Sequence, residues 1–422
     1  MKTKAQYYST LPLYFCLLCL GSFCEANTIP SSANSPISIV DNAADFIVHN
    51  SMVLDSNGFP VISYKASQNL MLARCLDTAC ENVTRTIIDE NIATIYDTSI
   101  ALTNTDIPII AYNSSASGLK MAICNDTACS NPLIKTLFNF QNGDIRDDVS
   151  LALNSSGFPV VSFRSNAYDL LIVVCNDVNC EEGIVSSLAT GIQTGVHNSL
   201  ALVDDIPIVS FSEKVDGSFL HILKIAICGD SVCSQSNKTI AILDDFPTDV
   251  GKYNAITINN GQITVSYQDV IQKQLRLVVC RDMLCNTLNR TILTEGVAVQ
   301  HIDMIMGSTG LPIISYQRTY TDQLRIIVCR DYLCYRRIET IFDNKLLIRN
   351  PSQPSTVLGD IEIFSSLALN DAGIPVLTFS GPYTLKLTVC SMCVIPVHRN
   401  LDSEVTTYTG QVQPDTFFRE FS

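Results

Sequence analysis

The chain has 422 residues, is 47% hydrophobic and carries a formal net charge of −14 at pH 7. A chain this acidic repels phosphate backbones and anionic lipid headgroups, so we expect neither nucleic-acid binding nor docking through a basic membrane patch. The acidic residues are scattered and no loop has the spacing of a calcium site. We interpret them as a solubilising surface and predict no metal and no cofactor, with calcium or basic partners as the open alternatives.

The first 26 residues read as a secretory signal peptide. Lys2 and Lys4 give a positive start, an apolar stretch runs from Leu11 to Leu20, and Ala26 is the expected cleavage position. That apolar stretch is shorter than the roughly 20 residues that a membrane-spanning helix needs, and no later stretch is long enough either. We expect a secreted, extracellular chain without a transmembrane anchor, or a periplasmic or cell-surface one in a bacterium.

Residues 27–47 form an N-terminal segment whose pattern ISIVD, at Ile37 to Asp41, resembles the fourth strand of the repeats that follow. Val40 precedes Ser51 by the same interval that separates Ile88 from Ser99 in the next repeat. We expect this segment to supply the fourth strand of the last repeat and so to close a ring, which removes an open sheet edge.

Residues 48–399 contain seven copies of one unit of about 50 residues, the kind of period that marks a repeat architecture. Each copy has four short segments rich in β-branched and aromatic residues, separated by turn residues, and helical periodicity is absent. Four antiparallel strands repeated seven times predict an all-β fold, a seven-bladed β-propeller. A tail at 400–422 lacks the repeat pattern.

Each repeat holds one close pair of cysteines between its third and fourth segments. Once the three cysteines of the signal peptide are removed, the number of cysteines in the chain is even. A zinc site needs about four ligands where one hairpin offers two, and the redox reading of Cys390 and Cys393 would need a helix start. We predict one structural disulfide per blade, as expected in an oxidising compartment. The pairs are Cys75-Cys80, Cys124-Cys129, Cys175-Cys180, Cys228-Cys233, Cys280-Cys285, Cys329-Cys334 and Cys390-Cys393.

A candidate site follows from aligning the repeats on their first strands. Three of the five histidines fall at one aligned position, two residues before the serine of the SLAL pattern. The residues at this position are His49, Asp97, Asp148, His197, Tyr253, His301 and Phe364. The residues next to them are Asn50, Thr98, Val149, Asn198, Asn254, Ile302 and Ser365.

Two interpretations of these positions stay open: packing at the start of each innermost strand, or a polar ring around the axis that binds a ligand. The predicted ligand-binding residues are His49, Asn50, Asp97, Asp148, His197, Asn198, Tyr253, Asn254 and His301. Tyr168 and Tyr320, in loops of the same face, could stack on a sugar or peptide, and an insertion at 343–363 opens there too. No residue is assigned a catalytic role.

Six Asn-x-Ser/Thr patterns are candidates for glycosylation in a eukaryotic source. They begin at Asn82, Asn113, Asn125, Asn154, Asn237 and Asn289.

The run SLALNSSGFPVVSF, followed by an apolar strand, resembles the repeats of secreted sialidase-like propeller proteins. The Asp-x-Gly-x-Thr-Trp core of true sialidases is absent, and the chain has no tryptophan. The three arginines that sialidases place around a carboxylate are also not matched, although Arg164 and Arg318 could face the ring. The resemblance implies the fold and says little about activity.

Three functions follow as hypotheses. The first is a monomeric, non-enzymatic binding protein that recognises an extracellular glycan or protein ligand at the loop face. The second is a sialidase-like glycoside hydrolase or lyase, for which Asp97 and Asp148 would be the carboxylates to test. The third is an acidic structural component of an extracellular matrix.

Overall fold

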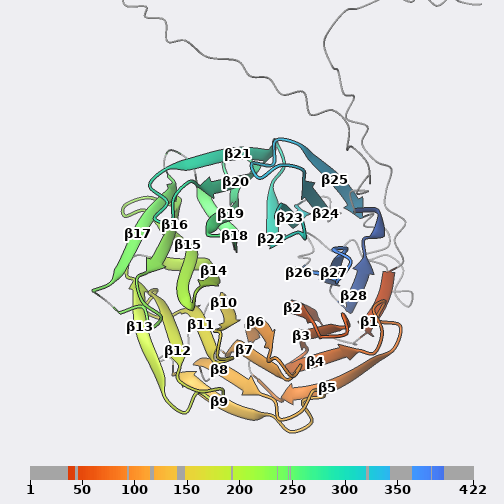
Figure 1. Ribbon diagram of the computed structural model, residues 1–422. Coiled ribbons are helices and arrows are strands. Elements are labelled where there is room, and N and C mark those ends of the chain that lie inside the picture. The colour runs from red at the N-terminus through yellow and green to blue at the C-terminus, as the bar shows by residue number, and fades with distance from the viewer. Residues whose placement is uncertain are drawn as a thin grey trace, which may run out of the picture.

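The chain forms a ring of seven four-stranded antiparallel sheets, as the repeat predicted (Figure 1). The computed structural model describes residues 37–42, 46–92, 95–114, 118–139, 148–191, 193–234, 236–245, 247, 249–319, 323–342, 364–381 and 383–393. The expected signal peptide, Tyr320, the 343–363 insertion and the 400–422 tail lie outside these residues. Within them, no helix has the length and apolarity to cross a membrane.

The first four blades follow one another along the chain. Blade 1 comprises β2 (Ile47–Leu54), β3 (Pro60–Ala66), β4 (Asn69–Cys75) and β5 (Val83–Asp89). Blade 2 comprises β6 (Ile95–Leu102), β7 (Pro108–Ser114), β8 (Gly118–Ile123) and β9 (Leu133–Phe138). Blade 3 comprises β10 (Val149–Leu153), β11 (Pro159–Arg164), β12 (Leu170–Cys175) and β13 (Gly183–Ala189). Blade 4 comprises β14 (Thr194–Val203), β15 (Ile206–Lys214), β16 (His221–Cys228) and β17 (Lys238–Asp244).

The last three blades complete the circle. Blade 5 comprises β18 (Val250–Asn259), β19 (Gln262–Asp269), β20 (Gln274–Cys280) and β21 (Leu288–Thr294). Blade 6 comprises β22 (Val299–Met306), β23 (Pro312–Arg318), β24 (Gln323–Cys329) and β25 (Arg337–Phe342). Blade 7 comprises β26 (Phe364–Leu369), β27 (Pro375–Gly381), β28 (Thr384–Val389) and β1 (Ile37–Asn42), and a short 3-10 turn follows at Ser391–Cys393.

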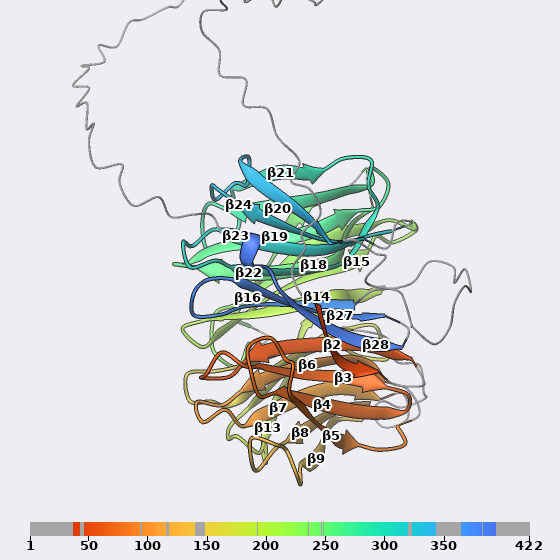
Figure 2. The same cartoon turned by 90° about the vertical axis from the view of Figure 1, so that its right-hand side faces the viewer.

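The ring closes through its N-terminal strand, which confirms the expectation for Ile37 to Asp41. β1 pairs antiparallel with β28, with Ile37 opposite Thr388 and Asn42 opposite Thr384. Figure 2 shows β28 beside the first blade, where the two ends of the ring meet. Backbone hydrogen bonds between the two ends of the chain thus cover the edge that an open blade would expose.

Burial changes in steps from the axis outward. The second strand of a blade is covered on both faces, as in β7, where every residue is buried. The fourth strand alternates between buried and exposed residues, as in β21. This gradient explains why the second segments read as continuous apolar runs and the fourth segments as mixed ones.

The hydrophobic core consists of seven clusters, one in each interface between neighbouring blades. Each disulfide lies in the cluster that its blade shares with the preceding blade. Cys228 and Cys233 of blade 4, for example, pack with Leu170 and Ile172 of blade 3. All seven predicted pairs are bonded within their own blade. The disulfides therefore hold the hairpin and also fill the space between blades.

In six repeats the cysteine loop contains an aspartate two residues after the first cysteine, a pattern that our reading of the sequence missed. Asp331 is typical: it accepts hydrogen bonds from the backbone N–H groups of Leu333 (3.1 Å), Tyr335 (3.1 Å) and Arg336 (2.7 Å). The second cysteine of each of these loops has a positive φ, 56° at Cys334. The aspartate satisfies the backbone donors of a tight turn that the disulfide closes.

Candidate functional site

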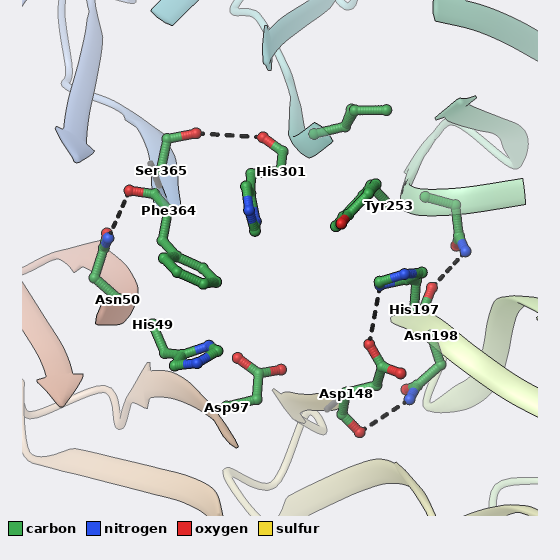
Figure 3. A pocket seen from close by; sticks show the side chains of 12 residues that line it. His49, Asn50, Asp97, Asp148, His197, Asn198, Tyr253, His301, Phe364 and Ser365 are labelled. Atoms are coloured by element: carbon green, nitrogen blue, oxygen red, sulfur yellow. Dashed lines mark hydrogen bonds and ion pairs between the residues drawn. The ribbon is translucent and has the colours of Figure 1, made fainter. Parts of the chain in front are cut away.

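The aligned positions at the starts of the innermost strands converge on one cavity of about 440 Å³ around the axis. All nine residues predicted as ligand-binding line it, and so do Ile302, Phe364 and Ser365 from the same aligned positions. Figure 3 shows their side chains arranged around a common opening. We call the seven residues at the first aligned position, from His49 to Phe364, the axial ring, and the end of the propeller that carries it the ring face.

The backbone at the axial ring is strained, which the sequence did not indicate. His49, His197, Tyr253 and His301 have φ between 49° and 51°, and Asp148 has φ 97°. Non-glycine residues rarely adopt this left-handed conformation, which costs on the order of 1–3 kcal/mol per residue. At four of these five residues the strand pairing skips in register, as between Val48 and Asn50. Such a bulge turns one side chain away from the pleat, here toward the axis.

In four blades the residue after the ring position bonds to the backbone of the preceding blade. Nδ2 of Asn198 donates to the carbonyl of Asp148 at 3.0 Å, and Nδ2 of Asn50 donates to the carbonyl of Phe364 at 2.8 Å. Asn254 donates in the same way to the carbonyl of His197, and Ser365 to that of His301. The carbonyl groups that accept these bonds therefore belong to the axial ring itself.

The amide oxygens of the same asparagines are also engaged. Oδ1 of Asn50 accepts a hydrogen bond from Thr378 at 2.8 Å, and that of Asn254 accepts one from Ser210 at 2.5 Å. Asn50, Asn198 and Asn254 thus line the cavity mainly as positioning residues, which favours the packing interpretation for these three.

The axial ring has two unlike halves. Five aromatic side chains follow one another around the axis, with centroid distances of 4.2 Å from His49 to Phe364, 4.2 Å from Phe364 to His301, 5.1 Å from His301 to Tyr253 and 4.3 Å from Tyr253 to His197. The remaining two positions, in blades 2 and 3, hold the carboxylates Asp97 and Asp148. Figure 3 shows both carboxylates facing the arc of aromatic rings.

Burial keeps two of the histidines neutral. It lowers the pKa of His49 to about 3, with Lys65 acting in the same direction and Asp148 opposing it. Burial also lowers the pKa of His301 to about 3, and the nearby His49 and His197 add to the effect. Both imidazoles are therefore uncharged at neutral pH, so the aromatic half of the ring gains no positive charge from them.

Two buried polar atoms of the axial ring have no hydrogen-bond partner: Oδ2 of Asp148 and Nε2 of His301. Asp148 is 7% exposed, and only its other oxygen has a neighbour, Nδ1 of His197 at 3.4 Å. By contrast, Asp97 accepts backbone hydrogen bonds on both oxygens, from Thr98 and from Val149 of the next blade. An unsatisfied buried carboxylate oxygen is costly, and a bound ligand that donates a hydrogen bond would remove that cost.

Other predicted residues lie apart from this cavity. Arg164 is buried and stacks over the ring of Tyr168 at 4.9 Å, and neither residue lines the cavity, nor does Arg318.

The glycosylation candidates differ in exposure. Asn113 is fully buried in β7, so the folded chain does not present this glycosylation candidate to solvent. Of the other five candidates, Asn82, Asn125 and Asn237 are exposed, and Asn154 and Asn289 are half-buried.

A second repeated feature that sequence reasoning missed is a charged cluster between blades. The hydroxyl groups of Tyr64 and Tyr267 donate to the carboxylates of Asp41 and Asp244, each in the fourth strand of the preceding blade, at 2.7 Å in both cases. Arg276 adds an ion pair to Asp244 at 3.0 Å. The recurring tyrosine of the second strands could have indicated this contact, because a buried phenol needs an acceptor.

The described residues contain no group of three or more histidine, cysteine, aspartate or glutamate side chains arranged to hold a metal ion.

The comparisons with known proteins support the fold alone. No protein-family model matches the chain, and no curated protein matches it by sequence. Among solved structures, a polysaccharide lyase, Uly1, is similar with a TM-score of 0.52 and 8% identity, over 81% of this chain and 89% of that one.

Two further structures are more distant. A protein of unknown function from Dyadobacter fermentans has a TM-score of 0.48 at 9% identity, over 84% of this chain and 98% of that one. AofleA from Arthrobotrys oligospora has a TM-score of 0.45 at 10% identity, over 75% and 97%. The strand order of the chain itself establishes a seven-bladed β-propeller, and likeness at this level of identity does not carry a sialidase identity or any activity.

Proposed function

We propose that this protein is an extracellular binding protein that holds its ligand in the axial cavity of the ring face. The proposal rests on two features that the axial ring combines: strained backbone and a buried polar atom without a hydrogen-bond partner. Five of its residues adopt left-handed backbone, and one of them, Asp148, keeps a buried carboxylate oxygen without a partner. Local costs of this kind cluster at sites where a ligand repays them.

The two faces of the propeller differ in a way that supports ligand access from the ring face. The half-buried and exposed glycosylation candidates lie in or next to the cysteine loops and the turns between first and second strands, at the opposite end of the blades. Any glycans attached there would leave the cavity open. Secretion itself is part of the proposal, and the seven disulfides are consistent with an oxidising compartment.

The enzymatic alternatives find less support in the cavity. A sialidase would need arginines for the substrate carboxylate, and no arginine stands among the described residues that line the cavity. A lyase acting on uronic acids must neutralise the sugar carboxylate, which Asp97 and Asp148 would instead repel. The matrix hypothesis predicts binding without a discrete pocket, and the cavity argues against it.

The proposal is tested by screening the protein against glycan and extracellular-protein arrays, with and without calcium. We expect saturable binding that His197→Asn weakens at least tenfold, because asparagine tolerates the left-handed backbone but removes the imidazole. A matched control is Asp216→Asn, an exposed position in a loop of the ring face outside the cavity. Binding that both variants leave unchanged would contradict an axial site, and hydrolysis of chromogenic glycosides that depends on Asp97 would favour the hydrolase.

A further inference from the structure

We propose that the axial cavity takes an organic cation, an ammonium or guanidinium group, between its carboxylate half and its aromatic half. This inference rests on the proposed function and specifies the chemistry of the ligand. It combines the two halves of the axial ring, which are otherwise separate observations.

The charge of the lining is the first argument. Asp97 and Asp148 supply negative charge, and no lysine or arginine stands among the described residues that line the cavity. Lys65, in β3, acts electrostatically on His49 but does not line the cavity. His49 and His301 are neutral at physiological pH, for the reason given above. A ligand that enters this opening therefore meets a net negative, partly desolvated surface, which favours a cation.

The unpartnered oxygen of Asp148 is the second and independent argument. Oδ2 is buried and lacks any hydrogen-bond donor, although the carboxylate lines the cavity. Ammonium and guanidinium groups carry several N–H donors and a positive charge, so either would offer the Asp148 carboxylate both a hydrogen-bond donor and a counter-charge.

The aromatic arc is the third argument. Tyr253 and Phe364 present ring systems across the opening from the two carboxylates, with neutral His301 between them (Figure 3). Cations bind favourably over aromatic faces within about 6 Å of the ring centroid. Among the described residues, no three histidine, cysteine, aspartate or glutamate side chains are arranged to hold a divalent metal, and calcium needs six to eight oxygen ligands where the ring offers two carboxylates.

The size of the cavity sets the scale of the cationic group. About 440 Å³ lies in the lower part of the range for small-molecule pockets. It accommodates a guanidinium or alkylammonium head with a short aliphatic stem, whether that head belongs to a free amine or to an arginine or lysine side chain.

Calorimetric titration with defined probes tests the inference. The probes are methylguanidinium and methylammonium chlorides, the capped peptide Gly-Arg-Gly, and the same peptide with neutral citrulline in place of arginine. We expect the arginine peptide to bind at least tenfold more tightly than the citrulline peptide. A much higher affinity for the arginine peptide than for methylguanidinium would identify a protein side chain as the source of the cationic group. Equal affinities for the two would identify a free cation.

Three variants locate the binding. Asp148→Asn should weaken cation binding at least tenfold and Phe364→Leu about fivefold, whereas Asp216→Asn should leave it unchanged. Asparagine is tolerated at the left-handed backbone of position 148, so the first variant should fold, and thermal unfolding checks this. Equal binding of the citrulline peptide, unchanged binding by Asp148→Asn, or binding of calcium at the cavity would overturn the inference.

Failure of the inference is distinguishable from failure of the proposed function. A neutral or anionic glycan whose binding is lost in His197→Asn would support the axial site and rule out the cation. If His197→Asn leaves ligand binding unchanged and Asp148→Asn leaves cation binding unchanged, both the axial site and the cation are ruled out.

Discussion

The two ends of each blade differ in how their polar groups are satisfied. At the cysteine loops, an aspartate in six of the seven repeats accepts the backbone N–H groups of its own turn, and a disulfide closes it. At the axial ring, four residue types share the aligned position, its backbone is left-handed in five blades, and two buried polar atoms lack partners.

This contrast teaches which end of the repeat serves the scaffold and which end is free for function. Where copies share a residue and that residue completes the local hydrogen bonding, its role is to fold the blade. Where copies differ while keeping a costly backbone, the fold holds a side chain in place for another purpose. The comparison predicts that changes at the cysteine loops lower stability, and that changes at the axial ring alter binding instead.

The largest expected effect comes from removing one disulfide. The double substitution Cys228→Ala and Cys233→Ala should lower the free energy of unfolding by about 2–4 kcal/mol, from loop closure and from lost packing against blade 3. Chemical unfolding measures this loss. Because the pair lies far along its blade from the axial ring, ligand affinity should stay unchanged, and a parallel loss of affinity would break the comparison.

A smaller effect concerns acid stability. The pKa of His301 is lowered to about 3 in the fold, whereas an unfolded histidine titrates near 6.5, so the unfolded chain binds more protons between these values. The stability that neutral His301 provides is therefore complete above pH 6.5 and declines as the pH falls toward 3. Between pH 7 and pH 5 the native chain should lose about 2 kcal/mol more than His301→Asn, by chemical unfolding at each pH. Parallel pH profiles would show that His301 is not desolvated as described.

A still smaller effect is expected at a cysteine loop. Asp331→Ala removes the acceptor of three backbone N–H groups and should cost about 1 kcal/mol, as the loss of a helix-capping side chain does. Asp331→Asn keeps one acceptor oxygen and should cost less. If the two variants unfold at the same denaturant concentration as the native chain, the aspartate has no structural role.

The fold could be predicted from the sequence because the strand pattern and the cysteine pairs repeat. Seven copies of one strand pattern, with a cysteine pair in each, predicted the blades, and the position of Val40 predicted the closing strand. Both depend on hydrophobic alternation and on the even spacing of the copies, which local sequence records directly. Aligning the copies also identified the residues that line the cavity, because equivalent positions in the blades of a propeller lie at equal distance from its axis.

The sequence did not separate the roles of neighbouring residues in the site. From the sequence, Asn198 and Asp148 were equivalent polar candidates. In the structure, the amide nitrogen and the amide oxygen of Asn198 both form hydrogen bonds within the protein, while Asp148 has one oxygen without a hydrogen-bond partner. That difference depends on contacts between residues about 50 positions apart and on left-handed backbone at a bulge, and neither has a local sequence signal. The tyrosine clusters between blades escaped for the same reason, since Tyr64 and Asp41 belong to different blades.

The thermal stability of ligand-free Asp148→Asn tests the central claim most directly. If Asp148 is held for a ligand, removing its buried charge and placing asparagine at a left-handed position should leave the unfolding temperature unchanged or raise it. If Asp148 instead supports the fold, the variant should be destabilised by more than about 1 kcal/mol, and the axial ring would be scaffold.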